Sequence, residues 1–261
     1  MTDAGSSEVL PLPFHPVEAV LDVQGKDLCR LDATTIVLWG LILDGPQGCQ
    51  DRCRRFLSDE ESARADRFIR DEDRQRYIFA RGCLRLLLGR YLNVEPGIVA
   101  LQVGPAGKPA LCKTTHGSDL SFNLSHAHGR ALIAIAQGRE VGVDLERIRP
   151  DVEVEKLSNR YFAPVEQTAI MQSAQEERPA RFFRYWVAKE AVLKAQGVGL
   201  RSLSQCKVLL AADGAGAEVL APADSLRRDS WTICFLSCGA GWDGAVAAQG
   251  RDWTARCGLV R

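Results

Sequence analysis

Residues 182–199 read FFRYWVAKEAVLKAQGVG, and the recurrence of apolar side chains every three to four positions predicts a helix with one buried side. Trp186, Glu190 and Lys194 are spaced four residues apart, so they lie along one stripe of this helix. Gly197 marks its end. Taken alone, Glu190 and Lys194 could be a surface ion pair worth about 0.3–0.5 kcal/mol. A second group of carboxylates upstream in the sequence argues that Glu190 and Lys194 have a function beyond a surface ion pair.

That second group lies in residues 141–146, which read VGVDLE and predict a strand. Asp144 and Glu146 are two residues apart, so they share one face of the strand, while the valines and the leucine share the other. Paired carboxylates are typical ligands of Mg²⁺, whose remaining positions are filled by phosphates and waters. The alternative is an edge strand with one solvated face.

Two further stretches carry polar residues that suit phosphate. Residues 120–136 read LSFNLSHAHGRALIAIA, which predicts two strands around a turn at His128, with Ser125 and His126 at the end of the first strand. A histidine at such an edge is either structural or a donor to phosphate. Residues 104–110 read GPAGKPA and predict a loop with Lys108 at its tip.

Arginines gather in two predicted helices of the first half. Ser58 looks like the N-cap of a helix that continues to Phe68, and residues 71–91 predict a second helix. The arginines that we place wholly or partly outside the buried side are Arg64, Arg67, Arg74, Arg76, Arg81, Arg85 and Arg90. They form either a solvated surface or the binding site of a multiply charged phosphate.

The remaining pattern favours an α+β fold. Residues 1–34 show no sustained period, so we expect a loosely held segment, and residues 34–43 predict a central strand. Two helices are expected between residues 151 and 178, and strands at 206–210, 217–220, 231–236 and 244–248. Each half runs strand, helix, strands, which suggests duplication. We therefore expect two similar α+β lobes in a pseudo-twofold arrangement, an N-terminal lobe of residues 1–137 and a C-terminal lobe of residues 138–261.

Composition narrows the classes of function. The 261 residues include 33 basic and 33 acidic side chains, and this balance argues against a nucleic-acid or membrane-surface binder. Nine cysteines without zinc-type spacing suggest reduced core thiols. We recognise neither a signal peptide nor a run near the roughly 20 apolar residues that span a membrane. We therefore expect a cytoplasmic protein.

The segments FNLSH, VGVDLE and WVAKEAVLK, in this order and preceded by GKP, resemble the 4′-phosphopantetheinyl transferases of the larger, surfactin-synthetase-activator type. The resemblance covers residues 56–199 well and the C-terminal sheet only in pattern. It implies two lobes that clamp coenzyme A and Mg²⁺ between them. It also implies transfer of the phosphopantetheine arm to a serine of an apo acyl or peptidyl carrier protein. One chain would complete the site, so we expect a monomer.

The resemblance also implies roles for individual residues. The metal ligands would be Asp144, Glu146 and Glu190, with Glu190 also the candidate base. Lys194 and His126 would counter the charge of the diphosphate as the bond breaks. Coenzyme A would be bound by Arg64, Arg76, Arg81, Lys108, Ser125, His126 and Lys194. Trp186 is expected to pack the helix rather than to react.

Two other classes of protein remain open at this point. A coenzyme A or carrier-binding module without turnover would keep the cations, and it would leave the mass of the carrier unchanged when coenzyme A and Mg²⁺ are added. A metal phosphohydrolase would use His126, His128, Asp144 and Glu146, and it would release product without a carrier.

Overall fold

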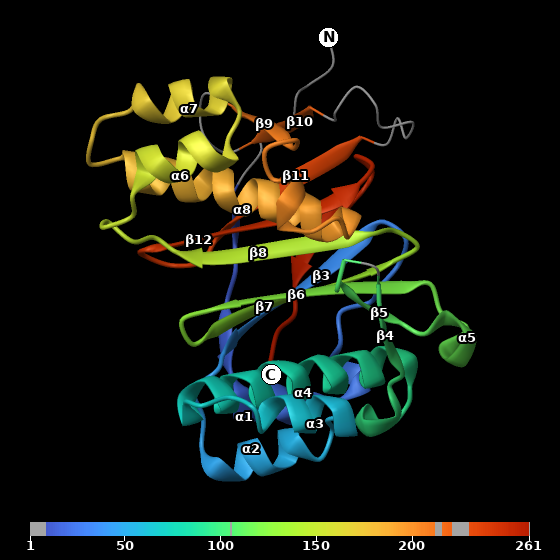
Figure 1. The fold of residues 1–261 in the computed structure, drawn as a ribbon. Coiled ribbons are helices and arrows are strands. Elements are labelled where there is room, and N and C mark those ends of the chain that lie inside the picture. The colour runs from blue at the N-terminus through green and yellow to red at the C-terminus, as the bar shows by residue number, and fades with distance from the viewer. Residues whose placement is uncertain (1–8, 105, 212–215, 221–229, 261) are drawn as a thin grey trace.

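The computed structural model describes residues 9–104, 106–211, 216–220 and 230–260, and it folds into four layers (Figure 1). Helices cover the outer face of each of two sheets, and the sheets face each other. Three apolar clusters fill the spaces: one under each helix layer and one between the sheets. The mixed α+β class and the two similar lobes are as predicted.

The sheet of the N-terminal lobe has the order β13-β3-β7-β6, with β2 also beside β3. Its strands are β2 (Phe14–Pro16), β3 (Thr35–Ile42), β6 (Leu120–Ala127), β7 (Arg130–Gln137) and β13 (Thr254–Cys257). β3 pairs with β7 on one side and with β13 on the other, which confirms the predicted central strand. It is packed on both faces, and for this reason its sequence is an apolar run rather than an alternation.

The sheet of the C-terminal lobe has the order β8-β12-β11-β10-β9, with β1 beside β11. Its strands are β1 (Leu10–Pro11), β8 (Val141–Arg147), β9 (Lys207–Leu210), β10 (Ala217–Leu220), β11 (Trp231–Ser237) and β12 (Trp242–Gln249). The strands predicted in this half of the chain are all present. β8 is an edge strand here, as β6 is in the other sheet.

Helices cover the outer faces. The N-terminal lobe has α1 (Val17–Leu21), α2 (Gln47–Arg54), α3 (Asp59–Ala65) and α4 (Asp71–Leu92). The C-terminal lobe has α6 (Val154–Tyr161), α7 (Pro164–Met171) and α8 (Arg178–Gln196). Shorter elements are η1 (Gly25–Asp27), η2 (Pro96–Ile98), β4 (Leu101–Val103), β5 (Pro109–Leu111), α5 (Lys113–His116) and η3 (Leu200–Ser202).

The signals at two helix ends are confirmed. The Ser58 hydroxyl accepts from the Glu61 N–H, while the Glu61 carboxylate accepts from the Ser58 N–H, so α3 begins with a capping box. α8 ends before Gly197, which adopts the left-handed conformation with φ 68°. No helix in the described ranges is long and apolar enough to cross a membrane.

Two expectations were wrong. The described part of the entry segment is not loosely held, because β1 and β2 extend both sheets and Val17, Val20 and Leu21 of α1 are buried. Arg85 is buried rather than surface-exposed, and its guanidinium binds Glu61.

The boundary at 137/138 falls in the turn between β7 and β8, and β1 and β13 each cross to the sheet of the other lobe. The division into residues 1–137 and 138–261 stays a proposal.

Candidate active site

The two edge strands β6 and β8 lie side by side and are joined by side chains, in a contact that we call the β6–β8 seam. The Ser121 hydroxyl donates to the Arg139 carbonyl at 2.5 Å, and the Asn123 side-chain carbonyl accepts from the Val143 N–H at 2.9 Å. The Ser125 hydroxyl donates to Asp144 Oδ1 at 2.9 Å. These three β6 residues alternate along the strand, so they share the face toward β8. Asn123 was not among the predicted site residues, although the alternation of Ser121, Asn123 and Ser125 with apolar residues was a usable signal.

The seam brings three predicted residues into contact. Lys194 of α8 places its ammonium 2.5 Å from Asp144 Oδ1 and 3.0 Å from the Ser125 hydroxyl. Asp144 and Ser125 are both buried. Gly142 makes this approach possible, because a Cβ there would lie 2.1 Å from the Ala191 carbonyl of α8. The helix therefore rests directly on the backbone of β8.

Glu146 and Glu190 complete a group of carboxylates around this contact. Burial and then the charge of Asp144 raise the pKa of Glu146 to about 7. Burial, the charge of Asp144 and that of Glu146 raise the pKa of Glu190 to about 7 as well. Lys194 opposes both shifts. Burial and the neighbouring carboxylate therefore both disfavour the charged forms of these two groups.

The donor set fits a hard divalent cation. Asp144 Oδ2 and Glu190 Oε1 are buried and find no hydrogen-bond partner in the described part of the chain, which is costly for carboxylate oxygens. In the same part, no three His, Cys, Asp or Glu side chains are already arranged to hold a metal ion. Instead, the Lys194 ammonium is paired with Asp144. The carboxylates thus suit a divalent cation in their chemistry and in their unpaired oxygens. Their side chains are not yet arranged in the geometry of a metal site.

His126 lies among positive charges at the end of β6. Its pKa is lowered, first by burial and then by the charges of Lys194, Arg81 and Arg64. Arg81 pairs with Glu61 at 3.2 Å, and Arg64 lies over the Tyr77 ring. A neutral histidine surrounded by cations suits an anionic ligand such as phosphate.

The side chains of Arg76 and Lys108 are bound to partners outside the group of Asp144, Glu146 and Glu190. Arg76 pairs with Glu72 and, at 3.5 Å, with Asp44. The Lys108 ammonium is bound to Glu140 at 2.8 Å and to the carbonyls of Ala195 at 3.0 Å and Val141 at 3.2 Å.

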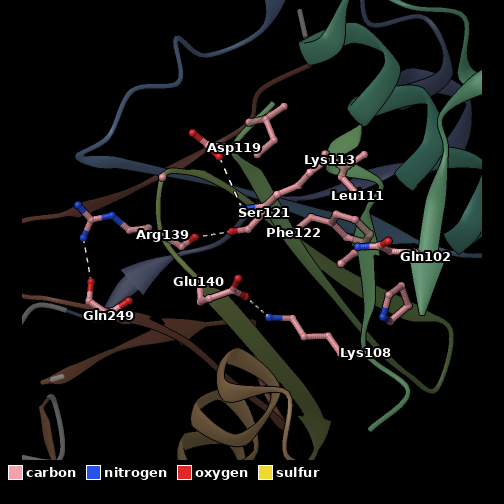
Figure 2. Close-up of a pocket in the computed structure, with 14 residues that line it drawn as sticks. Gln102, Lys108, Leu111, Lys113, Asp119, Ser121, Phe122, Arg139, Glu140 and Gln249 are labelled. Atoms are coloured by element: carbon pink, nitrogen blue, oxygen red, sulfur yellow. Dashed lines mark hydrogen bonds and ion pairs between the residues drawn. The ribbon is translucent and has the colours of Figure 1, made fainter. Parts of the chain in front are cut away.

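Lys108 is therefore largely buried rather than a solvated tip. Figure 2 shows it at the edge of a cavity of about 510 Å³, pointing toward Glu140. This cavity opens beside the first residues of β6 and the turn before β8 rather than at Asp144. The structure does not bring Lys108 or Arg76 into hydrogen-bond contact with the Asp144 group.

Trp186 packs as predicted. Its ring lies 5.7 Å from Phe182 and 5.7 Å from Tyr161, centroid to centroid, in an aromatic cluster that also includes Phe162. His128 packs against Trp242 at 6.5 Å.

The fold and this site define a structural class: two α+β lobes with carboxylates, a lysine and a histidine gathered where the edge strands meet. Family comparisons identify the class more closely. The profile of the 4′-phosphopantetheinyl transferase superfamily matches residues 140–236, and the profile of the 4′-phosphopantetheinyl transferase N-terminal region matches residues 50–138.

Curated relatives agree with these profiles. The 4′-phosphopantetheinyl transferase HetI of Nostoc sp. is 39% identical over 209 residues, which span 78% of this chain and 88% of the relative. The 4′-phosphopantetheinyl transferase Sfp of Bacillus subtilis is 27% identical over 180 residues, 68% of this chain and 78% of the relative. The chain belongs to the 4′-phosphopantetheinyl transferase superfamily, and it is an enzyme of the Sfp-like type.

Proposed function

We propose that the enzyme transfers the 4′-phosphopantetheine group of coenzyme A to a serine hydroxyl of an apo acyl or peptidyl carrier protein. The observation that carries this proposal is the contact of Lys194 with Asp144 and Ser125 beside Glu146 and Glu190. Family membership supports phosphopantetheine transfer in general. The acceptor and the roles of individual residues are our inference.

Asp144, Glu146 and Glu190 would hold Mg²⁺, since two of their oxygens are buried without a partner in the described residues. When bound, Mg²⁺ would neutralise the diphosphate and stabilise charge on the oxygen that leaves. Lys194 supplies a further positive charge at the same place.

The phosphates of coenzyme A would be bound by groups that already lie close to one another. Ser125 and Lys194 lie at the carboxylates, and Arg64 and Arg81 place their charges near His126. The lowered pKa of His126 favours the neutral imidazole, which would donate a hydrogen bond to a phosphate oxygen. Lys108 and Arg76 stay in the proposal as contributors that must first release their present partners.

The transfer itself needs no nucleophile from this chain. The carrier serine oxygen would form a bond to the phosphorus that bears pantetheine, and the bond from that phosphorus to the bridging oxygen of the diphosphate would break. The leaving group is 3′,5′-adenosine bisphosphate. Glu190 would accept the serine proton, since it lies beside Asp144 and Glu146 where the diphosphate would be held.

A mass measurement tests the proposal. Apo carriers of the fatty-acid, polyketide and peptide types are incubated with the enzyme and coenzyme A, with and without Mg²⁺. We expect one of them to gain the mass of one phosphopantetheine only when Mg²⁺ is present. Glu190→Gln should slow loading about 100-fold or more, whereas Glu155→Gln on the exposed side of α6 should not. Loading by E190Q at the wild-type rate would exclude Glu190 as the base.

The oligomeric state and location belong to the same proposal. One chain supplies the carboxylates, Ser125, His126 and Lys194 from β6, β8 and α8 and the arginines from α3 and α4, so a monomer suffices, and light scattering would show one. The nine cysteines are free thiols, which fits a reducing compartment such as the cytoplasm.

A further inference from the structure

A buried ion pair joins α8 to α7 next to the candidate base. Lys189 and Glu166 both have fully buried side chains, and the ammonium lies 2.6 Å from Glu166 Oε2. The ammonium also contacts the Tyr161 carbonyl at 3.4 Å and lies 4.6 Å from the centre of the Phe162 ring. Lys189 directly precedes Glu190 in the chain.

Glu166 is held by three elements at once. Its Oε2 accepts from the Ala163 N–H at 2.7 Å, which caps the start of α7. Its Oε1 accepts from the Val208 N–H of β9 at 2.8 Å. We call Glu166, Lys189 and these backbone groups the Glu166 clamp. Because two backbone N–H groups fix the Glu166 carboxylate, its contact with Lys189 restrains the rotation of α8 about its axis.

This rotation also sets the direction of Glu190. Successive residues of an α-helix are about 100° apart, so a helix held at Lys189 presents the next side chain toward β8. A buried ion pair seldom stabilises a fold more than an apolar pair of the same shape would. The clamp therefore differs from an apolar contact in the directions of its hydrogen bonds, and not in how much it stabilises the fold.

The N-terminal lobe contains a matching clamp, but the residue that follows its cation in the sequence is not a carboxylate. Glu61 caps α3 as Glu166 caps α7, and Arg85 of α4 binds it at 2.5 Å. Arg85 and Lys189 each lie eight residues before the left-handed residue that ends their helix, Asn93 or Gly197. The residue after Arg85 is a core leucine. The two lobes share the anchor, and only the C-terminal lobe has a carboxylate next to it.

We infer that Lys189 is a positioning residue: the Glu166–Lys189 ion pair fixes the rotation of α8 and so directs the Glu190 carboxylate to the Asp144 group. The inference rests on the proposed function for its catalytic consequence. It does not require Lys189 to touch the substrate, because the ammonium is enclosed by α6, α7 and α8.

The test replaces both charges together. Lys189→Met with Glu166→Gln removes the ion pair without leaving a buried charge. The glutamine oxygen can keep only one of the two backbone N–H groups that Glu166 binds, so we expect a folded enzyme of lower stability. We expect kcat to fall about tenfold to a hundredfold, because small misplacements of a catalytic group are costly. The KM for coenzyme A should change less than kcat, since His126, Arg64 and Arg81 lie on the other lobe and only Lys194 shares α8 with the clamp. Calorimetric titration with Mg²⁺ alone should show weaker binding.

Two further variants make the result decisive. Ile170→Ala loosens the same core on α7 and keeps the clamp, so it should lower stability without changing kcat. Glu166→Asp keeps both charges but shortens the side chain of the acceptor. It replaces the double variant if that does not fold, and its kcat should lie between those of the wild type and the expected double variant. A folded double variant with wild-type kcat and Mg²⁺ affinity would overturn the inference. If the wild-type enzyme loads no carrier, the proposed function fails, while the Mg²⁺ titration still tests the clamp.

Discussion

Asn123 is a single residue on which contact between the lobes depends. Its side-chain carbonyl accepts the Val143 N–H, and both groups are buried. Asn123→Leu would leave that N–H without an acceptor at similar side-chain volume. We expect it to lower the free energy of unfolding by about 1–3 kcal/mol, measured by urea denaturation.

Ser121→Ala provides the comparison for Asn123→Leu. Ser121 is only partly buried, and water can replace its bond to the Arg139 carbonyl, so its loss should cost less. Equal losses of stability in the two variants would mean that burial does not set the strength of these bonds. A loss of activity in Asn123→Leu alone would follow from the position of Val143 next to Asp144.

Cys112 should be the reactive thiol of the chain at neutral pH. Hydrogen bonds from Thr114 and Thr115 lower its pKa to about 7, whereas burial raises the pKa of Cys206 and Cys238 to about 12. The thiolate is the nucleophile, so alkylation of Cys112 should be half-maximal near pH 7. Peptide mass mapping after brief iodoacetamide treatment at several pH values would show this. Thr115→Val should move the midpoint to higher pH, and an unchanged midpoint would contradict the assigned cause.

Residue positions that follow a local period could be predicted, and those that depend on distant partners could not. Asp144 and Glu146 share a strand face, and Glu190 and Lys194 share a helix stripe, because spacing alone decides this. Arg85 depends on Glu61, which lies 24 residues away in sequence. Lys108 is bound by Glu140 and by the Ala195 carbonyl, 87 residues away. A single sequence carries no signal for such pairs.

At the scale of elements, the contact of α8 with β8 depends on Gly142. A Cβ there would lie 2.1 Å from the Ala191 carbonyl and 2.3 Å from the Ala195 nitrogen, and backbone cannot move aside as a flexible side chain can. Gly142→Ala should therefore push α8 away from β8. We expect a loss of stability of about 3 kcal/mol and a large loss of activity, measured by thermal unfolding and carrier loading.

A second glycine serves as the control for this prediction. Gly48 lies in α2, and a methyl group added to its Cα would meet no described atom within 4 Å. Gly48→Ala should therefore raise stability by about 0.5–1 kcal/mol. If Gly142→Ala were as stable and as active as the wild type, the helix would not rest on the strand as described.

Elements with strong periods or caps could be predicted, and weakly marked ones could not. α3 was predicted from the N-cap at Ser58 and β3 from its β-branched run. β13 has only four residues, and its place beside β3 is set by pairing with a strand far away in sequence. α2 has no side-chain cap and contains a glycine, so local preference for a helix is weak.

At the scale of the whole molecule, the lobes are alike in architecture and unlike in chemistry. In the N-terminal lobe the strand face toward α4 carries Val37, Trp39 and Leu41, all in the apolar core. In the C-terminal lobe the face of β8 toward α8 carries Asp144 and Glu146 after Gly142. The side chains of β3 on this face pack in the apolar core, whereas those of β8 are carboxylates, so among the described residues the candidate site lies on β8 and not on β3.

The apolar layer between the two sheets predicts that neither lobe folds on its own. Ile36, Leu38 and Leu132 of one sheet pack against Val143 and Val246 of the other, and β1 and β13 each complete the sheet of the opposite lobe. Residues 9–137 and 138–260, produced separately, would each expose this layer and lose one strand. We expect both fragments to aggregate or to bind the dye ANS without cooperative unfolding, whereas their coexpression should restore a folded complex. Cooperative unfolding of either fragment alone would show instead that each lobe is an independent domain.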